Sequence, residues 1–353
     1  MADNIALYTG TGRRKEATVI SMSSSLFSLQ LYKSAVRCRA MIFKRESLLC
    51  GKVEKLVISI IEDLVDNVKL EAYTISHLQN LREFYGGKRM AGGLSDRAGK
   101  TYKGKPPLLI QGAMKVETSH IVEQLDALEE YRLGEWYFAS GTYHGVPLAV
   151  SRTQWGLANA AATTALAMEF FHPCAVINQG TAGAHDPVLK NFDIVIGRET
   201  VNISAWKSHF RARGEGVDEE ALDQLGVFAY DKEARRFTQE VFHRADEDLF
   251  RTALALRNSY EKGSVTEGVI GTADSWNCQV DRVLFLHDFY GTAVEEMEGD
   301  AVAQICQTYD VPFLTIRVVS NTVFAGDVDW DLAVGAALQE YALAVAEAYM
   351  KKR

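Results

Sequence analysis

The sequence has few cysteines and no long hydrophobic run. Its 353 residues include five cysteines, which are scattered and form no Cys-x-x-Cys pair. A disulfide framework and a cysteine-based zinc site are therefore not indicated, and a reducing, cytoplasmic location is expected. No apolar run is long enough to cross a bilayer. Arg13, Arg14 and Lys15 could begin a signal peptide, but the serines from Ser21 to Ser28 dilute the apolar stretch that such a peptide needs.

Charge is distributed unevenly along the chain. Residues 1–105 hold 18 Lys and Arg against 10 Asp and Glu, whereas the remainder holds 20 against 36. Paired glycines between residues 86 and 93, and then Pro106-Pro107, predict a linker at the place where the balance changes sign. We therefore expect a basic N-terminal extension over residues 1–104 and a separate domain over residues 105–353.

The N-terminal extension gives little guidance. Residues 55–73 favour a helix, because Leu64, Val65 and Val68 fit helical spacing better than a strand. Residues 8–17 resemble the beginning of a bacterial small-subunit ribosomal protein over about a dozen residues, which we interpret as chance or as a chimeric gene start. A basic tail could bind nucleic acid, but no aromatic interleaving supports this. We therefore expect a weakly ordered extension and no nucleic-acid partner.

From residue 105 onward, short apolar runs alternate with amphipathic stretches. This pattern predicts an α/β layered domain with a largely parallel core. The expected strands are 108–112, 137–142, 147–152, 174–178, 192–197, 265–271 and 312–319. The expected helices are one carrying Ile121, Val122, Leu125 and Leu128, then 157–171, 245–260, 281–290, one that begins near Ala301, and 332–350.

Small and polar residues gather where these strands end. In parallel sheets ligands bind beyond the carboxyl ends of the strands, so these segments predict a ligand site. They are Gly112–Glu117, Gly180–Gly183, Gly271–Asn277, Glu296–Glu298 and Ser320-Asn321.

The run from Glu295 to Asp300 precedes an apolar helix and has two interpretations. Carboxylates are stabilised in the first turn of a helix by its unpaired N–H groups. A carboxylate also accepts two hydrogen bonds side by side, as the vicinal hydroxyls of a ribose require, and Met297 offers a soft apolar surface for the sugar.

The order of these segments resembles the purine nucleoside phosphorylase/nucleosidase superfamily, and within it the 5′-methylthioadenosine/S-adenosylhomocysteine nucleosidases. The resemblance covers residues 107–350. It rests on Gly112-Ala113-Met114 with Glu117, Asn178–Gly183, Thr272-Ala273-Asp274 and Val294–Glu298. It implies a three-layer α/β sandwich around a mixed, partly barrel-like sheet, a homodimer, a small nucleoside as substrate, and no metal or cofactor.

The resemblance also implies roles in cleaving an N-glycosidic bond. Glu117 corresponds to the base that activates water, Glu298 to the residue that binds the ribose hydroxyls, and Trp276 to an aromatic residue that stacks on the purine. Thr181 stands near the reactive centre, and Met297 packs on the sugar. The implied substrate-binding residues are Thr181, Trp276, Asn277, Glu296, Met297, Glu298 and Ser320.

Asn321 departs from the nucleosidase pattern. Nucleosidases carry an aspartate here, which protonates N7 of the leaving adenine, and an asparagine amide cannot deliver that proton. Either the enzyme is slow, or another acid such as Asp274, Asp327 or Asp329 acts, or the base is not adenine. Ala184, which replaces a second glycine, is a minor departure.

Three alternative functions stay open. Phosphorolysis is less favoured because Gly112–Glu117 lacks the phosphate-binding arginine of phosphorylases, and Thr153–Gly156 after Arg152 matches their second phosphate loop poorly. Residues 202–243 form either a solvated loop or a lid, and their cations would suit a nucleotide phosphate, as in an AMP nucleosidase. A non-catalytic nucleoside-binding or storage protein is also compatible with Asn321.

Overall fold

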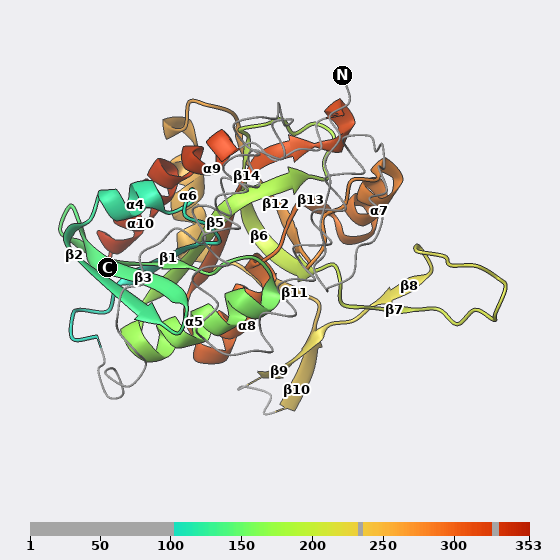
Figure 1. The fold of residues 1–353 in the computed structure, drawn as a ribbon, viewed down its shortest axis with the longest axis horizontal. Helices are drawn as coiled ribbons and strands as arrows, with labels where there is room; N and C mark the ends of the chain where they lie inside the picture. The colour runs from blue at the N-terminus through green and yellow to red at the C-terminus, as the bar shows by residue number, and fades with distance from the viewer. Residues whose placement is uncertain (1–101, 232–235, 327–331) are drawn as a thin grey trace, which may run out of the picture. The chain divides into compact units, whose positions relative to one another are not determined.

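The computed structural model describes residues 102–353 except 232–235 and 327–331. The helix expected over residues 55–73 and the segment 8–17 lie outside the described residues, and the boundary at residue 105 stays a prediction. None of the described helices is both long and apolar enough to span a membrane. The described residues form a mixed α/β domain (Figure 1).

Ten strands of the described chain form the main sheet, and four short strands form two separate hairpins. The main-sheet strands are β1 (Leu108–Gly112), β2 (Asp126–Leu133), β3 (Trp136–Tyr143), β4 (Val146–Arg152), β5 (Ala175–Ala184), β6 (Ile194–Asn202), β11 (Phe242–Arg244), β12 (Val265–Thr272), β13 (Thr292–Glu296) and β14 (Phe313–Thr322). The hairpin strands are β7 (Trp206–Ser208), β8 (Leu222–Gln224), β9 (Val227–Asp231) and β10 (Arg236–Glu240).

Seven α-helices and two short 3-10 helices complete the described part. The α-helices are α4 (Ser119–Glu123), α5 (Leu157–Phe171), α6 (Glu247–Ala255), α7 (Val280–Tyr290), α8 (Gly299–Tyr309), α9 (Leu332–Ala337) and α10 (Gln339–Met350). The 3-10 helices are η2 (Arg257–Ser259) and η3 (Val323–Ala325).

Five of the strands close into a barrel. β5 pairs with β13, β13 with β12, β12 with β6, and β14 pairs with both β6 and β5. Some of these pairs are parallel and others antiparallel, so the sheet is mixed. Each barrel strand contributes to one buried apolar cluster, which includes Ala182, Val195, Ile270, Val294 and Val319. The expected mixed, partly barrel-like sheet is therefore confirmed.

Beyond the barrel the sheet continues from β5, and helices cover both of its faces. β1 joins β5 to β4, and β3 and β2 follow toward the edge. Leu108 and Ile110 of β1 pack on one side with α4, α6 and α10, whereas Leu109 packs on the other side with α5 and α8. This alternation of side chains along a strand produces the three layers seen in Figure 1.

Several sequence predictions are confirmed, and others need correction. Helix α5 has the predicted bounds, and β1, β12, α7 and α8 agree closely. The helix expected to carry Leu125 and Leu128 ends at Glu123. The chain then forms edge strand β2, which pairs with β3 across a turn at Gly134. The pairing partner lies outside any local window, so helical spacing alone misled the prediction.

The strands of the barrel are longer than predicted. β5 runs to Ala184 and so includes the glycine-rich run that we expected to follow the strand, and β13 was not predicted as a strand. Residues 332–350 are divided at Leu338 into α9 and α10. Much of the segment expected as a loop or lid over residues 202–243 forms the hairpins β7–β8 and β9–β10.

Candidate functional site

Glu117 lies beyond the end of β1, and the ends of two strands converge on it. Its Oε2 accepts hydrogen bonds from the backbone N of Ala113 at 2.8 Å and of Met114 at 3.0 Å. Its Oε1 accepts from the backbone N of Thr181 on β5 at 3.0 Å and from the Thr181 hydroxyl at 3.2 Å. The carboxylate is therefore held in one orientation by residues from both strands.

The surroundings of Glu117 oppose ionisation overall. Its side chain is buried, and burial raises the pKa of this carboxyl above its ordinary value. The Thr181 and Met114 hydrogen bonds and the charge of Arg317 act in the opposite direction. A carboxylate with a raised pKa is a better proton acceptor, which suits a general base.

Arg317 of β14 extends into the barrel as a fully buried cation. Its Nε donates to Glu296 Oε2 at 3.2 Å, and its Nη2 also contacts this oxygen and the side chain of Asn178. Its Nη1 donates to the Asn178 carbonyl at 3.1 Å. Because buried charges are costly unless paired, Glu296 and Asn178 are needed to keep Arg317 inside the barrel.

Glu296 is saturated by partners from the protein itself. Besides Arg317, its carboxylate accepts from the Thr272 hydroxyl and from the backbone N of Glu298 at 2.9 Å and of Gly299 at 2.8 Å. No lone pair suited to a sugar hydroxyl is left in this arrangement.

Glu298 occupies the N-cap position of α8 and is buried. Its Oε1 accepts from the backbone N of Gly156, just before α5, at 2.9 Å. Burial, and then the negative charge of Glu296, raise the pKa of Glu298 to about 8, although Arg317 opposes them. Glu117 contributes to the same rise, so the two carboxylates predicted to act on the substrate lie within electrostatic reach of each other.

Ser320 and Asn321 lie near the end of β14, where the register against β5 shifts. The Ser320 hydroxyl lies 2.8 Å from Asn321 Oδ1 and 3.2 Å from the Ala182 carbonyl. The Asn321 amide lies against Gly183, because a Cβ at that glycine would be 3.4 Å from Nδ2. Both residues are buried at the same end of the barrel as Thr181.

The segment after β12 carries the predicted purine-stacking residue. The Trp276 side chain is exposed to 51%, so it is not a core tryptophan. Asp274 Oδ1 accepts from the backbone N of Leu157 at 2.8 Å, and Asn277 is bound by Glu295. Glu298 and Asp274 therefore bind the consecutive amides of Gly156 and Leu157 at the start of α5.

The structure thus brings Glu117 and Thr181 into hydrogen-bond contact, and it places Glu298 within electrostatic reach of Glu117, Glu296 and Arg317. Ser320 and Asn321 lie at the same end of the barrel as Thr181. Trp276 is exposed, and Met297 is half-buried. The sequence did not indicate Arg317, and it indicated Asn178 and Gly156 only as members of longer segments, without a role in the site. A single arginine inside the apolar run Phe313–Val319 was the available signal for Arg317, because such a residue must find a buried partner.

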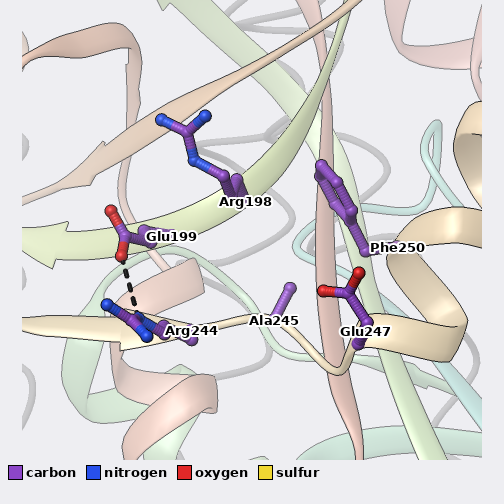
Figure 2. A pocket seen from close by; sticks show the side chains of 6 residues that line it. All are labelled: Arg198, Glu199, Arg244, Ala245, Glu247 and Phe250. Carbon is purple, nitrogen blue, oxygen red and sulfur yellow. Dashed lines mark hydrogen bonds and ion pairs between the residues drawn. The ribbon is translucent and has the colours of Figure 1, made fainter.

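A separate pocket of about 300 Å³ lies between β6, β11 and α6, lined by none of these residues (Figure 2). Its two arginines are already paired: Arg244 with Glu199 at 3.2 Å, and Arg198 with Glu267 at 3.3 Å. Within the described residues, no cluster of three or more His, Cys, Asp or Glu could hold a metal ion.

The barrel, the sheet that continues from it and the carboxylates at the strand ends define a class of proteins. The family model of the phosphorylase superfamily matches residues 107–350, and the chain belongs to that superfamily. A 5′-methylthioadenosine/S-adenosylhomocysteine nucleosidase from Shewanella pealeana is 32% identical over 214 residues, which cover 60% of this chain and 84% of that protein. Within the superfamily, the chain belongs to this nucleosidase family.

Two solved structures share the fold. One is a 5′-methylthioadenosine/S-adenosylhomocysteine nucleosidase from Colwellia psychrerythraea in complex with adenine, with a TM-score of 0.55 and 22% identity over 70% of this chain and 97% of that one. The other is a futalosine hydrolase from Helicobacter pylori, with a TM-score of 0.52 and 25% identity over 70% and 97% of the respective chains. Residues of this chain align with nearly the whole length of both of these proteins.

Proposed function

We propose that this protein hydrolyses the N-glycosidic bond of purine nucleosides and releases the free base. The geometry of Glu117 is the observation that carries the proposal: a buried carboxylate is held by Thr181 and by two backbone amides, within the field of Arg317 and Glu298. 5′-Methylthioadenosine and S-adenosylhomocysteine are the first candidate substrates, because the relatives that match this chain are named for them.

We assign each site residue one role in the reaction. Glu117 takes a proton from the attacking water, and Glu298 binds the ribose hydroxyls as positive charge develops on the sugar. Met297 packs on the sugar and Trp276 on the base, while Thr181 orients Glu117. We assign Glu296 a supporting role in place of the expected substrate contact, because its oxygens are occupied by Arg317, Thr272 and backbone amides.

Asn321 favours a second candidate substrate class, nucleosides of a 6-oxopurine. Its Oδ1 already accepts from the Ser320 hydroxyl, and its NH₂ group has two hydrogens to donate. It can therefore donate to N7 and to a 6-oxo group, both of which are acceptors, without transferring a proton. Asp274 is a less suitable substitute acid than the sequence indicated, because its Oδ1 already binds the backbone of Leu157. Asp327 and Asp329 lie outside the described residues.

Replacing Asn321 with aspartate tests this point. We expect Asn321→Asp to raise the rate on adenine nucleosides, by up to the ~10²–10⁴-fold that general-acid help contributes. The gain should appear in single-turnover rates and not in the ground-state Kd, because only the transition state needs the proton. If the native protein hydrolyses methylthioadenosine fast and Asn321→Asp slows it, the base is activated by another group.

The less favoured alternatives have weaker support in the structure. Two side chains between β7 and β8 already contact carboxylates there, His209 with Asp223 at 3.0 Å and Arg211 with Asp218 at 2.7 Å, so they do not form an open phosphate site. Retention of Glu117 and Glu298 opposes a purely storage role.

We further propose a homodimer that acts in the cytoplasm in methionine salvage, with the domain boundary near residue 105.

One panel of substrates separates these functions. Base release is measured from methylthioadenosine, adenosylhomocysteine, adenosine, inosine and AMP, each with and without inorganic phosphate. Release that does not depend on phosphate supports hydrolysis, whereas release that requires phosphate and yields a sugar phosphate would establish a phosphorylase. Binding of nucleosides without release of base from any of them would establish a non-catalytic protein.

A further inference from the structure

The segment from Ala273 to Gln279, between β12 and α7, is held at two points. Asp274 binds the start of α5 through Leu157 N at 2.8 Å. Three residues later, Glu295 binds Asn277 with both oxygens: Oε1 accepts from the backbone N at 2.6 Å and Oε2 from Nδ2 at 2.6 Å. Only Ser275 and Trp276 lie between these two attachments, so the backbone that carries the exposed Trp276 ring is restrained on both sides.

On its other side, Glu295 lies next to the buried His185. The Glu295 carboxylate is buried, and its Oε2 lies 3.2 Å from Nε2 of His185, whose side chain is 1% exposed. The opposite ring nitrogen, Nδ1, lies 2.7 Å from the Thr292 hydroxyl. Because that hydroxyl donates to the Leu286 carbonyl at 3.1 Å, it accepts from Nδ1–H. The opposite atom, Nε2, is buried beside Glu295 and has no hydrogen-bond partner among the described residues.

Glu295 and His185 also place this segment beside the rest of the site. His185 directly follows β5, and Glu295 is opposite Gly183 in the pairing of β13 with β5. Gly183 is also the residue against which the Asn321 amide lies. Glu295 thus links the segment bearing Trp276 to the strand ends that bear Thr181 and Asn321.

We propose that Glu295, through its two hydrogen bonds to Asn277, is a positioning residue for the purine base. It holds the segment 273–279 so that Trp276 presents a fixed aromatic face, and the base stacks on that face without first ordering it. Pre-organisation of this kind lowers the entropic cost of binding. The inference rests on the proposed function, since it needs a purine ligand, but it concerns binding of the base and not the hydrolytic step.

Glu295→Gln tests the proposal, because an amide NH₂ cannot accept a hydrogen bond and one of the two attachments to Asn277 is lost. We expect the Kd for free adenine or hypoxanthine and the KM for the nucleoside to rise together, by roughly tenfold, since base stacking on an aromatic ring contributes on that scale. The kcat should change by less than about twofold, as for a loss of uniform binding. Glu267→Gln, at an exposed position on β12, is the matched control and should leave both constants unchanged.

A double-mutant cycle distinguishes positioning from general destabilisation. If Glu295 acts through Trp276, then Glu295→Gln should add less than about twofold to the loss already caused by Trp276→Ala. Independent, multiplying losses would overturn the proposal. Asn277→Ala, which removes one attachment and leaves Glu295 in place, provides the same comparison should Glu295→Gln fold poorly.

Binding of the free base keeps this inference separable from the proposed function. A native protein that binds no purine base would overturn the proposed function and this inference with it. A native protein that binds and releases purine bases, with unchanged base affinity in Glu295→Gln and Asn277→Ala, would overturn the role of Glu295 alone.

Discussion

At Glu117, a single carboxylate receives hydrogen bonds from Ala113, Met114 and Thr181 while it is buried from solvent. Glu117→Gln keeps the shape of this group but cannot take a proton from water. We expect the rate of base release to fall by about 10²–10⁴-fold while nucleoside binding stays nearly unchanged. Turnover and Kd measured on the same preparation check this, and unchanged turnover would remove Glu117 from the mechanism.

The pH dependence of the native enzyme provides a second test of Glu117. The base acts only when ionised, and burial raises its pKa. The rate should therefore fall as the pH is lowered, with a midpoint above the value of about 4.3 that is usual for a glutamate. Glu117→Gln should lose this acidic limb. An identical limb in both proteins would assign it to another group.

Glu298 is expected to act on the sugar and not on the base. Glu298→Ala removes the group that we propose binds the ribose hydroxyls. Above its pKa of about 8, where Glu298 is ionised, riboside binding should weaken by roughly 10²-fold, the scale of hydrogen bonds to a charged group. Binding of the free base should change far less, and calorimetry on both ligands measures the difference. A native protein that handles ribo- and 2′-deoxynucleosides alike would show this assignment to be wrong.

At the scale of single elements, β5 shows why a glycine-rich run continues a strand. Gly180 lies on β5 against Glu117, and a Cβ there would be 2.8 Å from Glu117 Oε1. Gly180→Ala should therefore displace the carboxylate and lower activity by about 10²-fold, as a misplacement near 1 Å can do. Gly335→Ala on α9 is the control, because its Cβ would make ordinary contacts of 3.6 Å with Glu117 and Thr181, and its closest neighbour would be the Val116 side chain at 3.3 Å. Equal losses in both variants would contradict this explanation.

The elements differ in how far sequence alone could predict them. Leu157–Phe171 was predicted with correct bounds because an alanine-rich helix is specified by local residues. The stretch Asp126–Leu133 was misread because its strand conformation depends on pairing with β3. Thr181 and Asn321 could be proposed as site residues from their positions after apolar runs. The partners of Glu296 and Glu295 could not, since Arg317 and Asn277 meet them only after the barrel closes.

At the scale of the whole domain, one buried charge network supports both stability and chemistry. Arg317 bridges β14 to Glu296 on β13 and to Asn178 on β5, and its charge lowers the pKa of both Glu117 and Glu298. Removing one member leaves an unpaired charge inside the barrel, which is costlier than losing the pair together. The network therefore links the closure of the barrel to the ionisation of the residues that we propose bind and activate the reactants.

Arg317→Met tests this link. We expect the melting temperature to fall by on the order of 10 °C, because breaking a buried ion pair destabilises strongly. Arg198→Met, which breaks the exposed pair with Glu267, should change it by no more than about 2 °C. Adding Glu296→Gln to Arg317→Met should recover part of the loss by removing the orphaned charge.

In Arg317→Met the acidic limb of the rate profile should also move to higher pH, because the cation that favours ionised Glu117 is gone. A stable Arg317→Met protein with an unshifted profile would show that this network is not needed for either purpose.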